Sequence, residues 1–179
     1  MNDRPGIDWV QEHRNAAARE AALAVVLPPP SDSLQTVTYT SAGKTLIIGS
    51  ADSALNCADQ LCGVLPVTVL LTSPAADTAP APPRSYPVLH GSEVQVGGWL
   101  GAFDARWRDA GRAVLQREGR FDLVLDLSAE PLIKAHQKPH GYLAPGASQA
   151  GIAEAIDNLA QMIGEFEKPK YFRYKERLC

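Results

Sequence analysis

The sequence predicts a single α/β domain with a three-layer-like, Rossmann-like arrangement, in which a parallel βαβ core is extended by an antiparallel hairpin portion. Two short apolar runs, 44–49 and 67–71, flank an amphipathic segment at 52–62, and a strand, helix and strand in that order form a βαβ unit with parallel strands. Apolar and charged residues alternate over 101–108, which is typical of an antiparallel strand with one wet face. A chain of 179 residues with 45% apolar content can bury one core of this size.

The first 40 residues predict one helix and one strand. Residues 8–27 are rich in alanine and favour a helix, which the run Pro28–Pro30 would end. Residues 34–40, LQTVTYT, are rich in β-branched side chains and indicate a strand.

The βαβ core follows directly. The run KTLIIG at 44–49 ends in glycine and predicts a buried strand. Within 52–62 the apolar positions have helical spacing; they are Ala54, Leu55, Ala58, Leu61 and Cys62. The run VTVLL at 67–71 predicts the second buried strand.

Residues 73–87 are rich in proline and alanine, which excludes a helix or a central strand. The segment is either a linker between domains or an irregular loop on one domain, and we expect the loop because each flank is too small to fold alone. Residues 88–96 then predict a strand, Gly97–Gly98 a turn or bulge, and 101–108 the alternating strand.

The last third predicts a strand at 121–127, a long loop at 131–146 that contains three prolines, and a helix at 148–166. Ser148 is a suitable N-cap for this helix. We expect this helix and helix 52–62 to cover the faces of the sheet.

We divide the chain into an N-terminal helical segment at 1–30, an α/β domain at 31–166 and a tail at 167–179. Ten side chains of the α/β domain are expected to be buried: Leu46, Ile47, Ile48, Val69, Leu70, Val124, Leu125, Ile152, Ile156 and Leu159.

The charge and hydropathy of the chain limit its partners. The net charge of −3 argues against nucleic acid or an anionic membrane surface as a partner. No apolar run approaches the roughly 20 residues of a membrane span, and the N-terminus lacks the apolar stretch of a secretory signal. These features favour a cytoplasmic protein.

The turn after the first buried strand is a candidate cofactor-binding site. A dinucleotide fingerprint, G-x-G-x-x-G, places a pyrophosphate at a helix N-terminus, but here its positions hold Gly49, Ala51 and Ala54. Gly49, Ser50 and Asp52 could still bind an anion or nucleotide. The alternative is an ordinary βα turn, which the two alanines favour.

A second candidate comprises Asp126, Glu130, His136 and His140, near the carboxyl end of strand 121–127. The i, i+4 histidine spacing is that of a helical metal pair, but Pro139 disfavours a helix here. We expect a solvated or hydrogen-bonded loop, in which Asp126 bonds to backbone groups.

Cysteines and aromatic residues supply the remaining candidates. Cys57 and Cys62 point in different directions on the predicted helix and are poorly placed to share a metal. A further group of aromatic residues could anchor a partner or form one side of the sheet's core, and we expect the core role; these residues are Trp99, Phe103 and Trp107. The chain contains no recognisable catalytic triad, P-loop or C-x-x-C motif.

Several stretches resemble the domain that precedes the cluster motifs in a family of bacterial 4Fe–4S ferredoxin-like iron–sulfur proteins. The matching stretches are SAGKTLIIG (41–49), LPVTVLLTSP (65–74), GWLGAF (98–103), FDLVLDLS (121–128), GYLAPG (141–146) and GEFEKPKYFRYKERLC (164–179). In the family the last stretch runs into the first cluster-ligand cysteine, whose position Cys179 matches.

The resemblance implies a role in electron transfer. The 4Fe–4S clusters are implied for the parent family and not for this chain, because every cluster cysteine beyond Cys179 is absent. Cys179 would be a metal ligand only if the chain continued into a cluster motif, so the tail would lead to a cluster-binding module that is absent here.

The leading hypothesis is a non-catalytic domain that positions this adjoining module or docks a redox partner protein. The alternative is a degenerate dinucleotide-binding domain of an oxidoreductase, suggested by the sequence GSADSA at 49–54.

Overall fold

The computed structural model describes residues 9–24, 36–72, 83–111 and 115–169. The helices are α1 (Trp9–Leu23), α2 (Ala51–Leu61) and α3 (Gln149–Ala160). The strands are β1 (Thr36–Ser41), β2 (Thr45–Gly49), β3 (Val67–Leu71), β4 (Val88–Trp99), β5 (Ala102–Asp109), β6 (Gln116–Phe121), β7 (Leu123–Asp126), β8 (Tyr142–Leu143) and β9 (Gly164–Pro169). Residues 36–168 form one compact unit, and α1 belongs to a separate unit.

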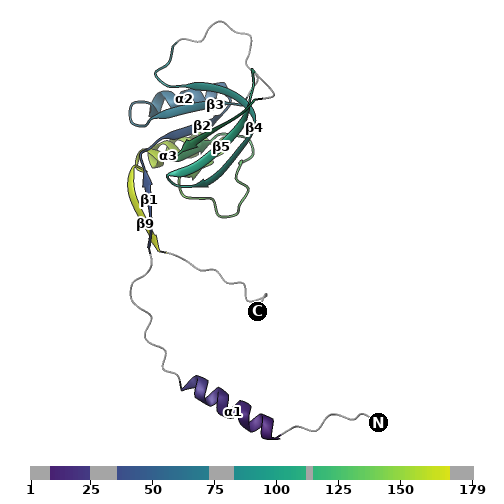
Figure 1. Cartoon of the computed structure of the whole chain (residues 1–179). Helices are drawn as coiled ribbons and strands as arrows, with labels where there is room; N and C mark the ends of the chain where they lie inside the picture. Colours follow the sequence, from purple (N-terminus) through teal and green to yellow (C-terminus); the bar gives the residue numbers. More distant parts are fainter. Residues whose placement is uncertain (1–8, 25–35, 73–82, 112–114, 170–179) are drawn as a thin grey trace. The chain divides into compact units, whose positions relative to one another are not determined.

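The larger unit contains a seven-stranded sheet in the order β6-β5-β4-β3-β2-β7-β8 (Figure 1). β2 pairs in parallel with β3 on one side and with β7 on the other, and α2 connects β2 to β3. β4, β5 and β6 form the antiparallel portion. The mixed α/β class, the parallel βαβ core and the antiparallel extension are therefore confirmed, and strands on both sides of the proline-rich segment belong to one sheet.

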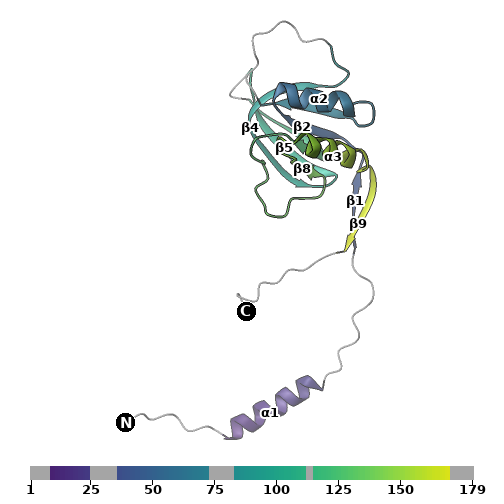
Figure 2. The same ribbon diagram turned by 180° about the vertical axis from the view of Figure 1, so that it is seen from behind.

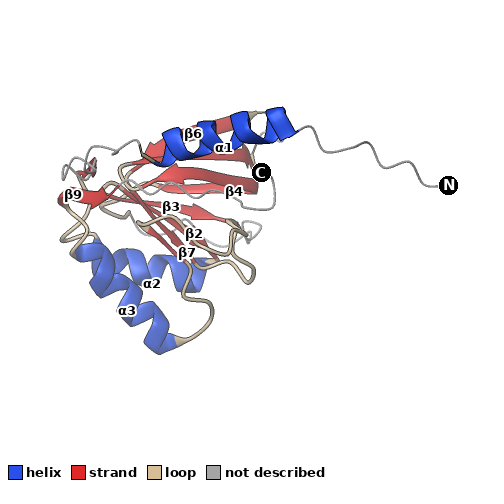
Figure 3. Ribbon diagram, turned by 90° about the horizontal axis from the view of Figure 1, so that it is seen from below, coloured by secondary structure: helices blue, strands red, loops and turns tan. Residues whose placement is uncertain are grey.

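The prediction that helices cover both faces of the sheet is wrong for the described residues. α2 and α3 pack in the same hydrophobic cluster, and Figure 3 shows them side by side on one face of the sheet. The opposite face is covered by inward side chains of β5 and β6, including Phe103, Trp107 and Phe121. The sheet can bend back in this way because β4 carries an irregularity between Ser92 and Gln95.

Three boundaries differ from the sequence prediction. β4 continues through Gly97 and Gly98 instead of turning there. The predicted strand 121–127 is divided at Asp122. Phe121 is the last residue of β6, which is antiparallel to β5, and the residues after Asp122 form β7, which is parallel to β2. β6 lacks the apolar pattern of a core strand because it is the edge strand of the sheet, and Phe121 is its buried residue.

The third difference concerns the predicted helix 148–166. α3 ends at Ala160, and residues 164–169 form β9. Gln161 is the C-cap residue of the helix, and Gly164, the first residue of β9, has a φ of 118°, which only glycine adopts without strain. The apolar Phe166 therefore contacts the core from a strand and not from a helix.

β9 pairs with β1 in a two-stranded sheet (Figures 1 and 2). The start of β2 is fixed beside it, because Asp122 Oδ2 accepts hydrogen bonds from the backbone N–H groups of Ala42 and Lys44 at 2.9 and 3.0 Å. The turn before β5 also lies against β1: a Cβ on Gly101 would come within 1.9 Å of the Thr40 carbonyl oxygen.

The predicted core is largely confirmed. Eight of the ten expected side chains are buried, while Ile152 and Ile156 are half-buried on α3 and pack against the same cluster as α2. The alternation of β5 is also as predicted, with Phe103, Ala105 and Trp107 buried. No described helix has the length and apolar character that a membrane crossing requires.

Candidate functional site

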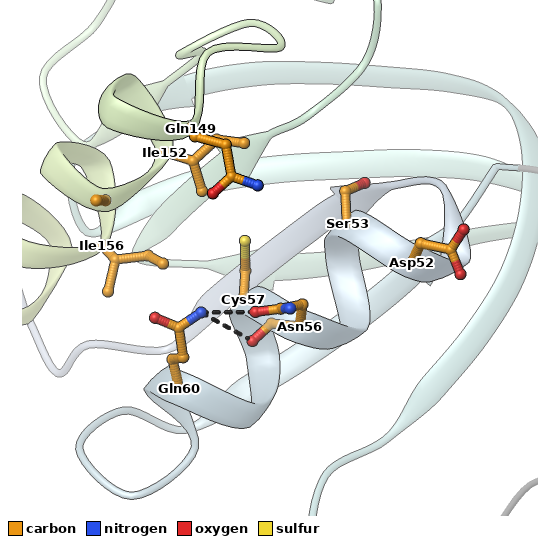
Figure 4. Close-up of a pocket in the computed structure, with 9 residues that line it drawn as sticks. Asp52, Ser53, Asn56, Cys57, Gln60, Gln149, Ile152 and Ile156 are labelled. Atoms are coloured by element: carbon orange, nitrogen blue, oxygen red, sulfur yellow. Dashed lines mark hydrogen bonds between the residues drawn. The ribbon is translucent and has the colours of Figure 1, made fainter.

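A groove of about 410 Å³ lies between α2 and α3 (Figure 4). It begins beside the first turn of α2, which follows the carboxyl end of β2. Ligands of open α/β sheets commonly bind at this end of the strands. The groove is lined by Asp52, Ser53, Asn56, Cys57, Gln60, Gln149, Ile152, Ala153 and Ile156.

The predicted anion-site residues lie at the start of α2, but they are not arranged as a phosphate cradle. Gly49 is buried, and a Cβ there would come within 2.9 Å of the Leu127 Cβ. The glycine is thus required by packing against the chain that leaves β7. The Ser50 hydroxyl lies 2.8 Å from Ser53 Oγ and makes no side-chain bond that caps the helix. Asp52 is exposed at the groove's edge.

The charges of the groove favour neutral polar groups over phosphate. Its lining includes the Asp52 carboxylate and no lysine, arginine or histidine, so a pyrophosphate would meet a like charge without a cation to offset it. The side-chain amides supply donors and acceptors, and Gln60 Nε2 donates to Asn56 Oδ1 at 2.7 Å. The groove can therefore hydrogen-bond an uncharged ligand along its length.

Cys57 lies at the base of this groove with its sulfur directed toward α3 (Figure 4). The side chain is 3% exposed, and burial raises the pKa of its thiol. A buried thiol held in the neutral form is a weak nucleophile. Cys62, the C-cap residue of α2, is exposed.

The second predicted cluster is not assembled as a site. Asp126 is fully buried, and its carboxylate accepts hydrogen bonds from the backbone N–H groups of Ser128 at 3.0 Å and Leu132 at 2.7 Å. The Tyr142 hydroxyl donates a third hydrogen bond to the same carboxylate. The prediction that Asp126 bonds to backbone groups is confirmed.

The other three residues of the predicted cluster, Glu130, His136 and His140, lie in different environments. Glu130 pairs with Lys134 at 3.7 Å, and His136 is exposed. His140 packs edge-on against the Phe166 ring, with 5.9 Å between ring centroids, and its Nδ1 is buried without a hydrogen-bond partner among the described residues. Among the residues that the structure describes, no three metal-ligating side chains come together.

Sequence reasoning missed two polar networks. One is the Asp126–Tyr142 pair, whose Tyr142 lies 16 residues away in a segment predicted to be loop. The other joins α2 to the segment before β4: Arg84 Nη1 donates to Asp59 at 2.7 Å and to the Tyr86 hydroxyl at 2.7 Å. No spacing rule links these residues, and only the fold brings them together.

The aromatic residues of the predicted hairpin divide between core and surface. Phe103 and Trp107 are buried, which confirms the core interpretation for them, whereas Trp99 is 58% exposed near the β4–β5 turn. Cys179 lies outside the described part of the chain, as do residues 73–82 of the predicted loop.

Comparison with known proteins identified no relative: no protein-family model, curated protein or solved structure matches this chain.

Proposed function

We propose that residues 36–168 form a non-catalytic domain of a 4Fe–4S iron–sulfur electron-transfer protein, which positions an adjoining cluster-binding segment or docks a redox partner. The observation that carries the proposal is the conformation of residues 164–169. In the family that the sequence resembles, the stretch that leads to the first cluster cysteine begins at the position of these residues. In this chain they form a strand that pairs with β1, and they are not the end of a helix.

A paired strand gives the chain a defined direction at this point. β9 is held by its pairing with β1 and by the contact of Phe166 with His140. The segment between β1 and β2 is fixed by its backbone hydrogen bonds to the Asp122 carboxylate. Electron transfer requires a fixed distance between redox centres and no general acid or nucleophile, so an ordered exit strand suits a positioning domain.

The test is iron binding by the natural gene product, purified without oxygen. We expect a brown protein with about four irons per cluster. The variant Cys179→Ser should lose iron, whereas Cys62→Ser, an exposed thiol outside the resembling tail stretch, should retain it. The 179-residue chain alone should bind no stoichiometric iron, because its three cysteines cannot supply four ligands.

Two results would contradict the proposal. A natural product that binds no iron after reconstitution with iron and sulfide would remove the electron-transfer role. Equal iron loss in Cys179→Ser and Cys62→Ser would remove Cys179 as the ligand that follows β9.

The second candidate is a degenerate, Rossmann-like dinucleotide-binding domain. One observation favours it: α2 follows β2 in a parallel βαβ unit, and the Ser50 side chain leaves the first N–H groups of the helix uncapped. Calorimetric titration with NAD(H), NADP(H), FAD and ATP tests it. Ser50→Asp provides a good N-cap but adds a negative charge, so it should abolish micromolar binding of a phosphate at this turn. Ser92→Asp on β4 is the control, and the candidate fails if no nucleotide binds or if both variants bind alike.

A further inference from the structure

A second, larger cleft of about 960 Å³ opens on the face of the sheet that α2 and α3 do not cover. It lies at the amino ends of the parallel strands, because Lys44 precedes β2, Thr68 is the second residue of β3 and Val88 begins β4. Its opposite wall comes from β5 and β6, including Trp107 and Phe121. Cavities of this size accommodate small organic ligands.

The base of the cleft is aromatic and aliphatic. Trp107 and Phe121 are almost fully buried and belong to the core cluster that Leu89 also contacts. Gly119 lies between the two rings, since a Cβ there would come within 2.9 Å of the Phe121 ring and 3.5 Å of the Trp107 ring. Val88 and Leu89 are half-buried and line the same cleft, so its apolar contact surface comes from these two side chains and from the small exposed parts of the two rings.

The Lys44 ammonium group lies on this aromatic surface. Lys44 Nζ is 5.1 Å from the centroid of the Phe121 ring, and its side chain makes no ion pair with any acid among the described residues. Its backbone N–H is bonded to Asp122, which fixes where the side chain starts. A cation beside an apolar surface and without a carboxylate partner is complementary to an organic anion.

The acidic side chains that line the cleft do not pair with Lys44. Arg117 and Asp109 also line the cleft, and they pair with each other at 3.3 Å. Glu118, the remaining acid of the lining, is exposed and lies 3.9 Å from Arg106 on β5. The acids that line the cleft therefore have arginine partners, while Lys44 has none among the described residues.

We propose that this cleft binds a small amphipathic organic anion, an aromatic ring system that carries one carboxylate or comparable oxyanion. The ring system packs against Val88, Leu89 and the exposed part of Trp107, and the oxyanion accepts hydrogen bonds from Lys44 Nζ. This proposal is independent of the electron-transfer role, because no residue of the cleft belongs to β9 or to the groove between the helices.

The test uses two fluorescent probes with nearly the same ring system, 8-anilinonaphthalene-1-sulfonate, which is anionic, and N-phenyl-1-naphthylamine, which is neutral. Lys44→Met keeps the length of the side chain and removes its charge. It should weaken binding of the sulfonate at least about tenfold, as expected for loss of a charge-assisted hydrogen bond. It should change binding of the neutral probe by less than about twofold. Lys134→Met, an exposed lysine outside the lining, is the control.

The position of the probe is tested separately. In a chain in which Trp9 and Trp99 are replaced by phenylalanine, Trp107 is the remaining indole, and the bound sulfonate should quench its emission. Circular dichroism shows whether each variant folds. Equal effects of Lys44→Met on both probes, equal effects of Lys44→Met and Lys134→Met, or sulfonate binding without quenching of Trp107 would each overturn the proposal.

Discussion

Replacing Tyr142 with phenylalanine tests what holds the loop between β7 and β8. The Tyr142 hydroxyl donates to the Asp126 carboxylate and accepts from the Ile133 N–H at 3.1 Å. Asp126 is fully buried, and Tyr142 is 2% exposed. Tyr142→Phe keeps the ring in the core and removes the hydroxyl that makes these hydrogen bonds.

The expected loss follows from the two partners that remain. A hydrogen bond to a charged group contributes roughly 1.5–3 kcal/mol, so the carboxylate should lose about 2 kcal/mol. The Ile133 N–H is half-buried, and leaving it without an acceptor should cost about 1 kcal/mol more. We therefore expect the free energy of unfolding to fall by about 3 kcal/mol.

Urea denaturation monitored by circular dichroism measures this loss. With a slope of about 2 kcal/mol per molar, the midpoint should fall by about 1.5 M. Tyr39→Phe is the matched control, because the Tyr39 ring contacts the core while its hydroxyl makes no hydrogen bond with the described residues. The control should change stability by less than about 0.5 kcal/mol.

Alkaline pH provides a second readout. Burial, and then the hydrogen bond to Asp126, raises the pKa of Tyr142 above its ordinary value of 10. The unfolded chain therefore releases this proton at a lower pH than the folded chain does. The stability from neutral Tyr142 is complete below about pH 10 and falls as the pH rises above it, so the difference from Tyr142→Phe should narrow there.

The reasoning is refuted if Tyr142→Phe and Tyr39→Phe are equally stable at neutral pH. It is also refuted if the difference between the wild type and Tyr142→Phe stays constant from pH 8 to pH 11, since Tyr142 would then titrate alike in both states.

Three further predictions concern caps, glycines and acid pH. Ser148→Ala should lower the free energy of unfolding by about 1 kcal/mol in a urea titration, because Ser148 Oγ accepts a hydrogen bond from the N–H of the third residue of α3 at 3.3 Å. Ser50→Ala should lower it by less than about 0.5 kcal/mol, because the Ser50 side chain makes no capping hydrogen bond. Gly101→Ala should lower the free energy of unfolding by at least about 2 kcal/mol, because the new Cβ would lie 1.9 Å from a carbonyl oxygen of β1. Gly146→Ala should lower it by about 1 kcal/mol, because Gly146 also has a positive φ but has open space around it. Burial, and then a nearby lysine on β9, lowers the pKa of His140 from 6.5, so stability should fall as the pH drops below about 6.5, and His140→Gln should abolish that part of the acid dependence.

Local pattern was sufficient for the centre of the sheet. β3 matches the predicted run 67–71 at both ends, and β2 and α2 lie within one residue of their predicted bounds. Continuous apolar runs and helical spacing are local properties of the sequence, and they determine which backbone conformation can bury these side chains. β5 was predictable for the same reason. Its apolar and charged residues alternate, and only one orientation of the strand buries the apolar side chains and leaves the charged ones in water.

At the candidate sites, the local sequence pattern was not sufficient to predict which residues contact each other. Gly49 is a candidate anion-binding residue by sequence, with an ordinary βα turn as the favoured alternative, but what requires a glycine there is contact with Leu127, which is 78 residues away in the chain. The sequence gives the spacing of His136 and His140 but not their surroundings, and the fold directs His140 to Phe166 on β9.

What the sequence by itself determined is the α/β class, the βαβ core and the residues that fill it, because burial of apolar side chains depends on their local period. Only the tertiary structure decided which face each helix covers, that residues 164–169 leave α3 as a strand, and that Lys44 lies over Phe121 without an acid partner among the described residues. These features depend on contacts between segments tens of residues apart, which no local pattern encodes: β9 exists because β1 offers it a hydrogen-bonding partner, and the cleft exists because β4 bends β5 and β6 over the open face of the sheet.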